Sequence, residues 1–421
     1  MRVVVQKFGG TCVESRSNQA VSAERIMEQK DQGIQPVVVI SAAGRLGQPY
    51  STAELVNTVT NIDPRISPRE LDLLMCCGEI ISTVAMAHLL STKGYDTIAL
   101  TGGQAGLITD VYHGHARVIR VEETHILRLL QDGKMIFVTG FQGVSERHAI
   151  TTLGEGGSDY TAVALAMLLA QHNQLPFGDE LQMMPLQIVK EVNGVMSVNP
   201  KTLGQVGPDE APRLLPNLSF DECVSMSGLG ADVLQHRSAR VARKHRIPII
   251  VRNLHCSELQ GTLVDETPAP TKPGQATCIP DIANLAIFTI QSDNDRLPGQ
   301  LEEYLGRERL THFVMAKETG EVRFAVKKEK YRDVVDIVQR ILFLRGLKAE
   351  IDAGGWSLVS VAGERLRDQQ PKWQAEATAE LKSAGIGIFG NITGDLSISF
   401  LVNEDQRIEA VRRLHSRFVL K

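Results

Sequence analysis

The sequence predicts an α/β protein in which a mainly parallel sheet lies between helix layers (α/β/α) and is followed by two smaller ferredoxin-like units. Three observations lead to this fold class. Short apolar runs alternate with helix-like segments through residues 1–265, the usual order of elements around a parallel sheet. Prolines gather in residues 266–280, which is a linker composition. Residues 281–421 then change to a β-α-β-β pattern that occurs twice.

Six apolar runs in the first part predict buried parallel strands, because a strand covered on both faces shows no polar alternation. They are Val3–Val5, Val37–Ile40, Thr97–Leu100, Met135–Val138, Ile188–Val189 and Ile249–Val251. Helices are expected between these strands. The clearest are Ser17–Gln29, capped by Ser17 or Asn18, then Pro68–Leu90 and Ser158–Ala170.

After the prolines at 268, 270, 273 and 280, shorter strands and helices alternate. Strands are expected at Leu285–Ile290, Arg309–Ala316, Val322–Val326, Leu358–Val361, Ile386–Ile388 and Leu396–Val402. Helices are expected at Pro298–Gly306, Tyr331–Arg345, Lys372–Ser383 and Glu404–Phe418. The helix Tyr331–Arg345 has an apolar face too wide for one small sheet, so part of it is expected to be covered by a second chain.

Composition excludes several classes of function. The 421 residues are 43% hydrophobic, enough for more than one core, and the net charge of −4 gives no basis for binding nucleic acid or an anionic membrane. Six scattered cysteines form no C-x-x-C pair, and the histidines show no metal-ligand spacing. No signal-peptide pattern and no uninterrupted apolar run of membrane-spanning length are present, so we expect a cytoplasmic protein.

Two glycine loops carry the clearest functional signal. The first strand ends in Lys7-Phe8-Gly9-Gly10-Thr11, and the second loop reads Gly154-Glu155-Gly156-Gly157-Ser158-Asp159. Glycines let backbone N–H groups approach phosphate oxygens, and a lysine adds positive charge beside them. The first loop is not a Walker A motif, since no Gly-Lys-Ser/Thr follows at the required spacing. Two such loops predict one split phosphate site.

Taken in order, these motifs resemble the aspartokinases of the amino-acid kinase superfamily, over nearly the whole chain. Besides the two glycine loops, the resemblance rests on Ser41-Ala42-Ala43-Gly44, Thr52, Gly78-Glu79, Thr101-Gly102 and Gly140-Phe141-Gln142-Gly143. The tail resembles that family's paired regulatory ACT domains, ending in Ile398-Ser399-Phe400-Leu401-Val402 and the segment Ala410–His415.

This resemblance implies that the protein phosphorylates the side-chain carboxylate of aspartate with ATP and Mg²⁺, giving an acyl phosphate. Lys7 and Asp159 are then the catalytic pair, and Glu79 receives the substrate ammonium. Further cofactor-binding residues are Gly9, Gly10, Ser41, Gly156, Gly157, Asn193, Gly194 and Lys201, and further substrate-binding residues are Thr52, Glu155 and Ser158. No protein-held metal site is expected, because Mg²⁺ would bind mainly to phosphate oxygens.

The sequence departs from the family pattern where ligands would bind. Glu155 stands where the family has an arginine for the substrate carboxylate, and Asp232 stands where Gly230-Ala231 would be followed by lysine. Three interpretations stay open: an aspartokinase that uses other cations such as Lys190 or Lys201, a kinase for another carboxylate, and an inert homologue retained for ligand sensing or assembly. The resemblance further implies a homodimer and an amino-acid effector at the ACT units.

Overall fold

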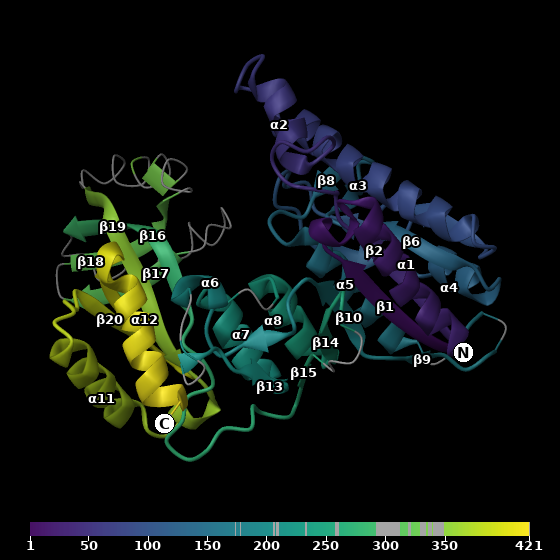
Figure 1. Ribbon diagram of the computed structural model, residues 1–421. Helices are drawn as coiled ribbons and strands as arrows, with labels where there is room; N and C mark the ends of the chain where they lie inside the picture. The colour runs from purple at the N-terminus through teal and green to yellow at the C-terminus, as the bar shows by residue number, and fades with distance from the viewer. Residues whose placement is uncertain are drawn as a thin grey trace. The chain divides into compact units, whose positions relative to one another are not determined.

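The computed structural model describes residues 1–420 except 173, 177, 205–206, 208–209, 232–233, 257–260, 292–311, 319–320, 329–333, 336–338 and 340–348. The predicted helix Pro298–Gly306, most of Tyr331–Arg345, and Asp232 lie outside the described residues. The chain divides into two compact units (Figure 1). Unit 1 comprises Met1–Val195, Pro216–Val224 and Val233–Pro268, and unit 2 comprises Met196–Leu215, Ser225–Asp232 and Ala269–Lys421.

A mainly parallel sheet forms the centre of unit 1, and all six predicted strands are confirmed within it. Its order is β13-β15-β14-β10-β1-β2-β6-β3, with β9 also pairing with β1, and only β14 and β15 are antiparallel to each other. The strands are β1 (Arg2–Phe8), β2 (Ile34–Ile40), β3 (Thr97–Leu100), β6 (Met135–Thr139), β9 (Gln182–Met183), β10 (Leu186–Lys190), β13 (Asn217–Ser219), β14 (Ile249–Asn253) and β15 (Thr262–Asp265).

Helices cover both faces of this sheet. Helices α1 (Arg16–Asp31) and α3 (Pro68–Ser91) bury one face with Phe8, Val38 and Phe137, while α5 (Gly157–Gln171) packs on β1, β2 and β10. The expected cap of the first helix was wrong: Ser15 caps it, and its Oγ accepts from the backbone N–H of Asn18. The other helices of unit 1 are α2 (Thr52–Thr60), α4 (Thr124–Gln131) and α8 (His236–His245), with a 3₁₀ turn at Gly10–Val13; α6 (Pro200–Leu203) belongs to unit 2, and α7 (Phe220–Gly228) is divided between the units.

A second, four-stranded sheet in unit 1 was not predicted. It has the order β5-β4-β7-β8, from β4 (Leu107–Thr109), β5 (Val118–Val121), β7 (Gln142–Ser145) and β8 (Ile150–Thr152). Helix α3 has the length and apolar composition of a membrane span, features shared by core helices of soluble proteins. Because it packs against β3, β6 and β8 and carries the buried carboxylates of Asp72 and Glu79, we treat it as a core helix.

The two β-α-β-β patterns of the tail contribute to one antiparallel sheet in unit 2. Its order is β17-β18-β16-β19-β21-β20, and the first three strands come from the first pattern. The strands are β16 (Asp281–Gln291), β17 (His312–Glu318), β18 (Glu321–Lys327), β19 (Ala349–Ala362), β20 (Gly390–Gly394) and β21 (Ser397–Asn403). The expected strand at Ile386–Ile388 was wrong, since pairing begins only at Gly390.

Helices α11 (Gln370–Ser383) and α12 (Arg407–His415) complete the described core of this unit, and a π-helical turn (Ser416–Leu420) extends α12. Short 3₁₀ turns lie at Glu364–Leu366 and Glu404–Gln406, and β11 (Val195–Met196) and β12 (Leu214–Leu215) form a separate two-stranded sheet. Trp373 stacks on Phe418 in the apolar core, with 5.2 Å between the ring centroids, so this tryptophan is a packing residue.

Candidate active site

The carboxyl ends of β10, β1, β2 and β6 meet at one edge of the unit 1 sheet. These strands are parallel, with Phe8 opposite both Val189 and Ile40, and Ile40 opposite Thr139. Their following loops therefore lie side by side, which is where open α/β sheets commonly bind ligands. This edge is the candidate active site.

The ammonium of Lys7 and the carboxylate of Asp159 form an ion pair of 2.8 Å at this edge. Lys7 is the penultimate residue of β1, and Asp159 lies in the first turn of α5. Both side chains are about nine-tenths buried, with 10% and 8% exposure. Burial alone would raise the pKa of Asp159, but the charges of Lys7 and then Lys190, with hydrogen bonds from Lys7 and Gln235, hold it below its usual range.

The second glycine loop is shaped by its backbone. Gly156 caps α5 in the left-handed region (φ 67°), and a Cβ there would lie 2.2 Å from Cγ of Gln235. Gly157 is buried, whereas Gly156 and Glu155 are exposed. In the part of the chain that the structure describes, Glu155 forms no hydrogen bond or ion pair. The second glycine loop thus lies at the N-terminus of α5 beside Lys7, and the positive end of a helix is a favourable place for an anion.

Glu79 lies in the middle of α3 with 3% exposure. Its Oε1 accepts a hydrogen bond from the backbone N–H of Ala42 at 3.2 Å, while Oε2 has no partner among the described residues. Burial raises the pKa of this carboxyl to about 8, and the Ala42 bond opposes that rise. A buried carboxyl with an unpaired oxygen is suited to receive a cationic group of a ligand.

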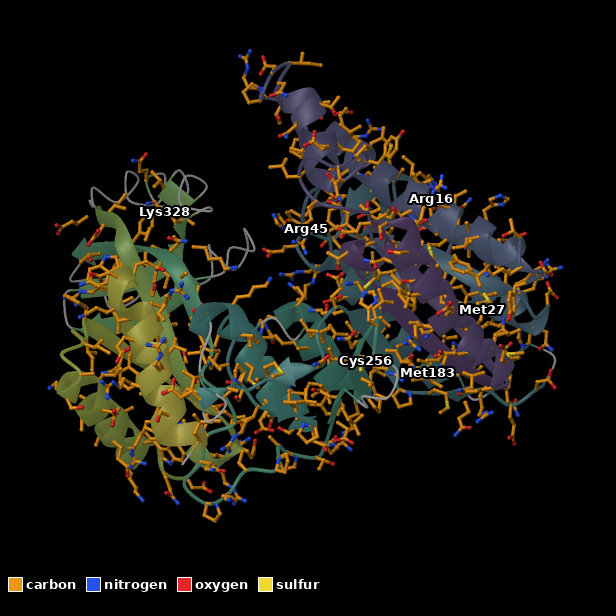
Figure 2. All side chains as sticks on the ribbon, viewed as in Figure 1. Arg16, Met27, Arg45, Met183, Cys256 and Lys328 are labelled. Atoms are coloured by element: carbon orange, nitrogen blue, oxygen red, sulfur yellow. The ribbon has the colours of Figure 1, made fainter. Side chains whose placement is uncertain are left out.

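The loop after β2 links the first glycine pair to Glu79. The N–H of Ser41 donates to the carbonyl of Phe8, and a Cβ on Gly10 would lie 2.6 Å from the Ala42 oxygen. Ser82 of α3 holds the next residue, since its Oγ accepts from the N–H of Ala43. Arg45, labelled in Figure 2, is exposed on the same loop. Gly9, Gly10, Ser41 and Glu79 are therefore brought together.

The other predicted site residues lie on several different elements. Ser158 is buried, 2.5 Å from where a Cβ on Gly140 would lie. Thr52 begins α2 and is half-buried, and Asn193 is exposed with its Oδ1 bonded to Nδ2 of Asn253 at 2.7 Å. Gly194 is buried in the loop after β10, whereas Lys201 belongs to α6 in unit 2.

Sequence reasoning missed the buried carboxylate of Asp72. Its oxygens accept from the backbone N–H groups of Gly114 and Thr152 and from the Thr152 hydroxyl, and Nδ1 of His113 lies 2.8 Å from Oδ2. Thr152 ends β8, two residues before Gly154. Asp72 thus anchors α3 to the strand that leads into the second glycine loop.

Two residues of the α8 region also escaped prediction. The N–H of Gln235 donates to Oδ2 of Asp159 at 3.4 Å. The guanidinium of Arg237 donates to the carbonyls of Ala116 and Leu153 and lies 4.1 Å from the ring centroid of Tyr160. Both residues contact the second glycine loop or the residues next to it. These contacts join distant segments of the chain, so a local sequence pattern does not predict them.

The donor set also bears on metals. Among the described residues, no group of three His, Cys, Asp or Glu side chains could hold a metal ion.

Comparisons with known proteins agree with this geometry. The model of the amino acid kinase family matches residues 2–253. The chain is 32% identical over 435 residues to the aspartokinase of Geobacillus stearothermophilus and 31% identical over 426 residues to aspartokinase 2 of Bacillus subtilis. Both matches cover all of this chain and 98% of the relative.

Solved structures show the same fold. E. coli aspartokinase III in complex with aspartate and ADP matches with a TM-score of 0.74 at 20% identity, over 99% of both chains. Clostridium acetobutylicum aspartate kinase matches with a TM-score of 0.69 at 16% identity, over 99% of this chain and 100% of that one. The fold, the glycine loops and the full-length relatives lead to one conclusion: the chain belongs to the aspartokinases, within the amino acid kinase family.

Proposed function

We propose that this protein transfers the γ-phosphoryl group of ATP to the side-chain carboxylate of L-aspartate, the first step of the aspartate pathway. The single observation that carries the proposal is the Lys7–Asp159 ion pair between two glycine loops at the carboxyl edge of a parallel sheet. The aspartokinase relatives support the choice of substrate, and a solved relative of the same fold binds aspartate and ADP.

In this reaction a carboxylate oxygen of aspartate forms a bond to the γ-phosphorus. The bond from phosphorus to the β–γ bridging oxygen breaks, and ADP leaves with that oxygen's electron pair. Two anions must approach each other, so the site has to supply positive charge and N–H donors. Lys7 would supply the charge, and Asp159 would hold its ammonium in place. The magnesium ion would add charge to the phosphates when bound.

The loops would complete the ligand contacts. For the nucleotide phosphates we propose backbone contacts from Gly9, Gly10, Gly156 and Gly157, with Ser41 beside them. For the rest of the nucleotide we propose Asn193 and Gly194 of unit 1, whereas Lys201, the other residue that the resemblance implies, belongs to unit 2. For aspartate we propose Glu79 as partner of the ammonium, Thr52 and Ser158 as hydrogen-bonding residues, and the exposed Glu155 as a further contact.

The other two interpretations are less favoured. A different carboxylate substrate would suit the charge of Glu155, and an inert homologue would explain the departures at ligand positions. The full-length similarity to aspartokinases and the assembled Lys7–Asp159 pair both support an active kinase for aspartate.

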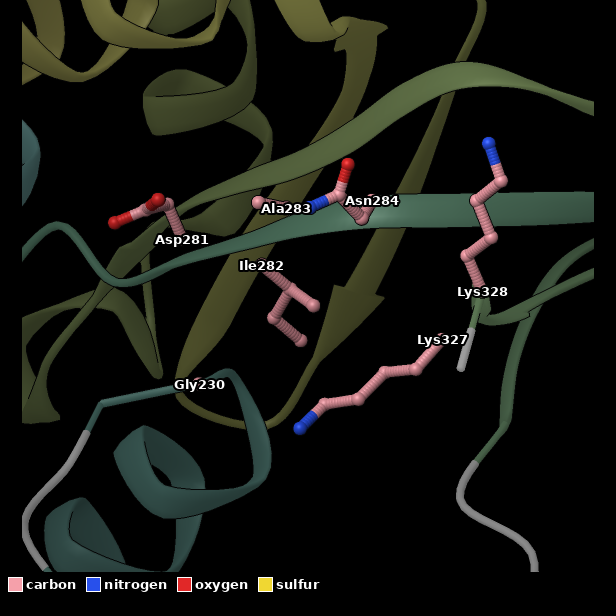
Figure 3. Close-up of a pocket in the computed structure, with 7 residues that line it drawn as sticks. All are labelled: Gly230, Asp281, Ile282, Ala283, Asn284, Lys327 and Lys328. Carbon is pink, nitrogen blue, oxygen red and sulfur yellow. The ribbon is translucent and has the colours of Figure 1, made fainter. Parts of the chain in front are cut away.

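Unit 2 is proposed to bind an amino-acid effector. Residues 1–265 would act as the catalytic domain, residues 266–280 as the linker, and residues 281–421 as the paired ACT regulatory domains. The same fold is seen in E. coli aspartokinase III in complex with lysine and aspartate. A hollow of about 500 Å³ in unit 2 is lined by Gly230, the segment Asp281–Asn284, Lys327 and Lys328 (Figure 3).

The two lysines of this hollow suit a carboxylate, while Asp281 already contacts Arg407 and Thr202. Lysine and threonine are the effectors to test by calorimetry, with Lys328→Ala expected to weaken binding. We also propose a homodimer, and a cytoplasmic location that suits six free thiols. Sedimentation at micromolar concentration tests the dimer, since a clean 46.2 kDa monomer would contradict it.

The activity is tested by trapping the acyl phosphate with hydroxylamine. With ATP, Mg²⁺ and aspartate, the wild type should form the hydroxamate, and Lys7→Met should lose at least about a hundredfold of that rate, as expected for a residue stabilising transferring charge. Lys93→Met is the matched control, since Lys93 is an exposed lysine after α3. A wild type that yields hydroxamate only with another carboxylate, or none at all, would refute the proposal.

A further inference from the structure

Lys190 is the last residue of β10, the neighbour of β1 in the unit 1 sheet. Lys7 is opposite Ile188 and Phe8 is opposite Val189, so continuing this parallel register by one residue brings Lys190 opposite Gly9. The backbone of Lys190 is fixed by the neighbouring strand, because Leu254 N–H donates to its carbonyl at 2.7 Å. Lys190 therefore borders the first glycine loop.

The side chains of Lys190 and Lys7 lie on the same face of the sheet. Side chains alternate along a strand, so Ile188 and Lys190 share a face, and Ile188 shares that face with its partner Lys7. Gln6 and Gln187, which hydrogen-bond to each other at 3.0 Å, occupy the opposite face. Helix α5, with Asp159 in its first turn, packs on the Lys7 side.

Electrostatics agree with this placement. Burial acts first on Asp159 and would raise its pKa, but the charges of Lys7 and next Lys190 lower it. Burial raises the pKa of the Cys223 thiol to about 12, and the charge of Lys190 opposes that rise. The half-buried ammonium of Lys190 thus acts on groups around the glycine loops, and not only on bulk solvent.

The charges at this edge favour a second cation. Asp159 already neutralises Lys7, and Glu155 and Glu191 add carboxylates to the same set of loops, whereas Glu79 keeps its proton below pH 8. A nucleotide triphosphate and a dicarboxylic amino acid would bring further negative charge. Besides Arg45 on the loop after β2 and a magnesium ion, a lysine at the end of β10 would offset part of this charge and so favour nucleotide binding.

We propose that Lys190 is a phosphate-binding residue that contacts the same nucleotide phosphates as Lys7. As a step in the kinase reaction it rests on the function proposed above, but as a nucleotide contact it can be measured without turnover. Asp159 then faces two cations in the ligand-free protein, and the phosphates take over part of their charge when nucleotide binds.

Calorimetry with a non-hydrolysable ATP analogue and Mg²⁺ tests this residue directly. We expect Lys190→Met to weaken binding by about tenfold or more, as for loss of a charge-assisted hydrogen bond, and Lys190→Arg to recover part of it. The loss should shrink for AMP, which lacks the outer phosphates. Lys93→Met serves as the control and should bind like the wild type.

Thermal unfolding of each variant separates binding from folding. Lys190→Thr, a β-branched residue that suits a strand end, replaces the methionine variant if that one fails to fold. Binding within twofold of the wild type, with or without a lower Tm, would overturn the proposal and leave Lys190 as a counter-ion of Asp159. An equal loss for AMP and the triphosphate analogue would also overturn it. Absence of hydroxamate in the wild type would refute the aspartate kinase function alone.

Discussion

The buried carboxyl of Glu79 allows a prediction that joins stability to substrate binding. In the folded protein without ligand its pKa is raised from an ordinary 4.5 to about 8, chiefly by burial. Between these values the folded state keeps a proton that the unfolded state releases. The free energy of unfolding therefore falls as the pH rises from 4.5 through 8, because the unfolded state binds fewer protons there.

The size of this effect follows from the two pKa values. Each pKa unit corresponds to about 1.4 kcal/mol, so the interval from 4.5 to 8 amounts to about 5 kcal/mol when the carboxyl is fully ionised. Glu79→Gln removes the titration and keeps an oxygen for the Ala42 N–H. We expect the variant to become progressively more stable than the wild type above pH 5, with the largest difference above pH 8.

Native-state hydrogen exchange of the β1 and β2 amides is the suitable assay, since it reports unit 1 by itself. The difference between variant and wild type isolates Glu79 from all other titrating groups. Glu24→Gln, an exposed position on α1, is the control and should show no such trend. Aspartate should stabilise the wild type and release a proton, because its ammonium favours the ionised carboxyl. Parallel pH profiles for Glu79→Gln and wild type would refute the reasoning.

Three further predictions concern two buried side chains and one glycine of the second loop. Asp72→Ala leaves several buried donors unpaired and should cost about 3–5 kcal/mol of stability, with a lower hydroxamate rate in what remains folded, whereas Asp72→Asn should be milder. Gly156→Ala should lose activity with a modest drop in Tm, because the new Cβ meets Gln235 and φ is 67°. Burial, and next Arg213, lower the pKa of His415 to about 4, so unit 2 should lose stability as the pH falls from 6.5 to 4. His415→Gln should remove that loss, as followed by tryptophan fluorescence, and an unchanged profile would contradict it.

The strands of the parallel sheet could be predicted because a strand that is buried on both faces is an uninterrupted apolar run, which is visible in the sequence. Val3–Val5 and Val37–Ile40 are apolar at every position, and both are fully buried. The four-stranded sheet carries no such signal. Gln142–Ser145 contains a glycine and Ile150–Thr152 has only three residues, so their pairing depends on the neighbouring strands and on the anchor at Asp72.

The candidate site likewise has residues that could be predicted from the sequence and residues that could not. The Lys7 and Asp159 motifs could be read from glycine loops, because phosphate binding needs a particular local backbone. The bracing residues could not, since Asp72 and Thr152 are 80 residues apart and Arg237 lies 84 residues from Leu153. Contacts of this kind arise from the order of the strands, which no short segment specifies.

The second glycine loop keeps the glycine that its backbone requires, but it carries a glutamate where the family has an arginine. The two positions differ in what the fold demands of them. Gly156 is required by the fold itself, because its φ is positive and Gln235 occupies the space of a Cβ. No such constraint is seen at Glu155, which is exposed and forms no hydrogen bond or ion pair with the residues that the structure describes. Replacing an arginine by a glutamate there would barely change the stability of the ligand-free protein. The fold therefore leaves residue 155 free to vary, and we propose that Lys190, at another strand end, supplies positive charge that the loop lacks.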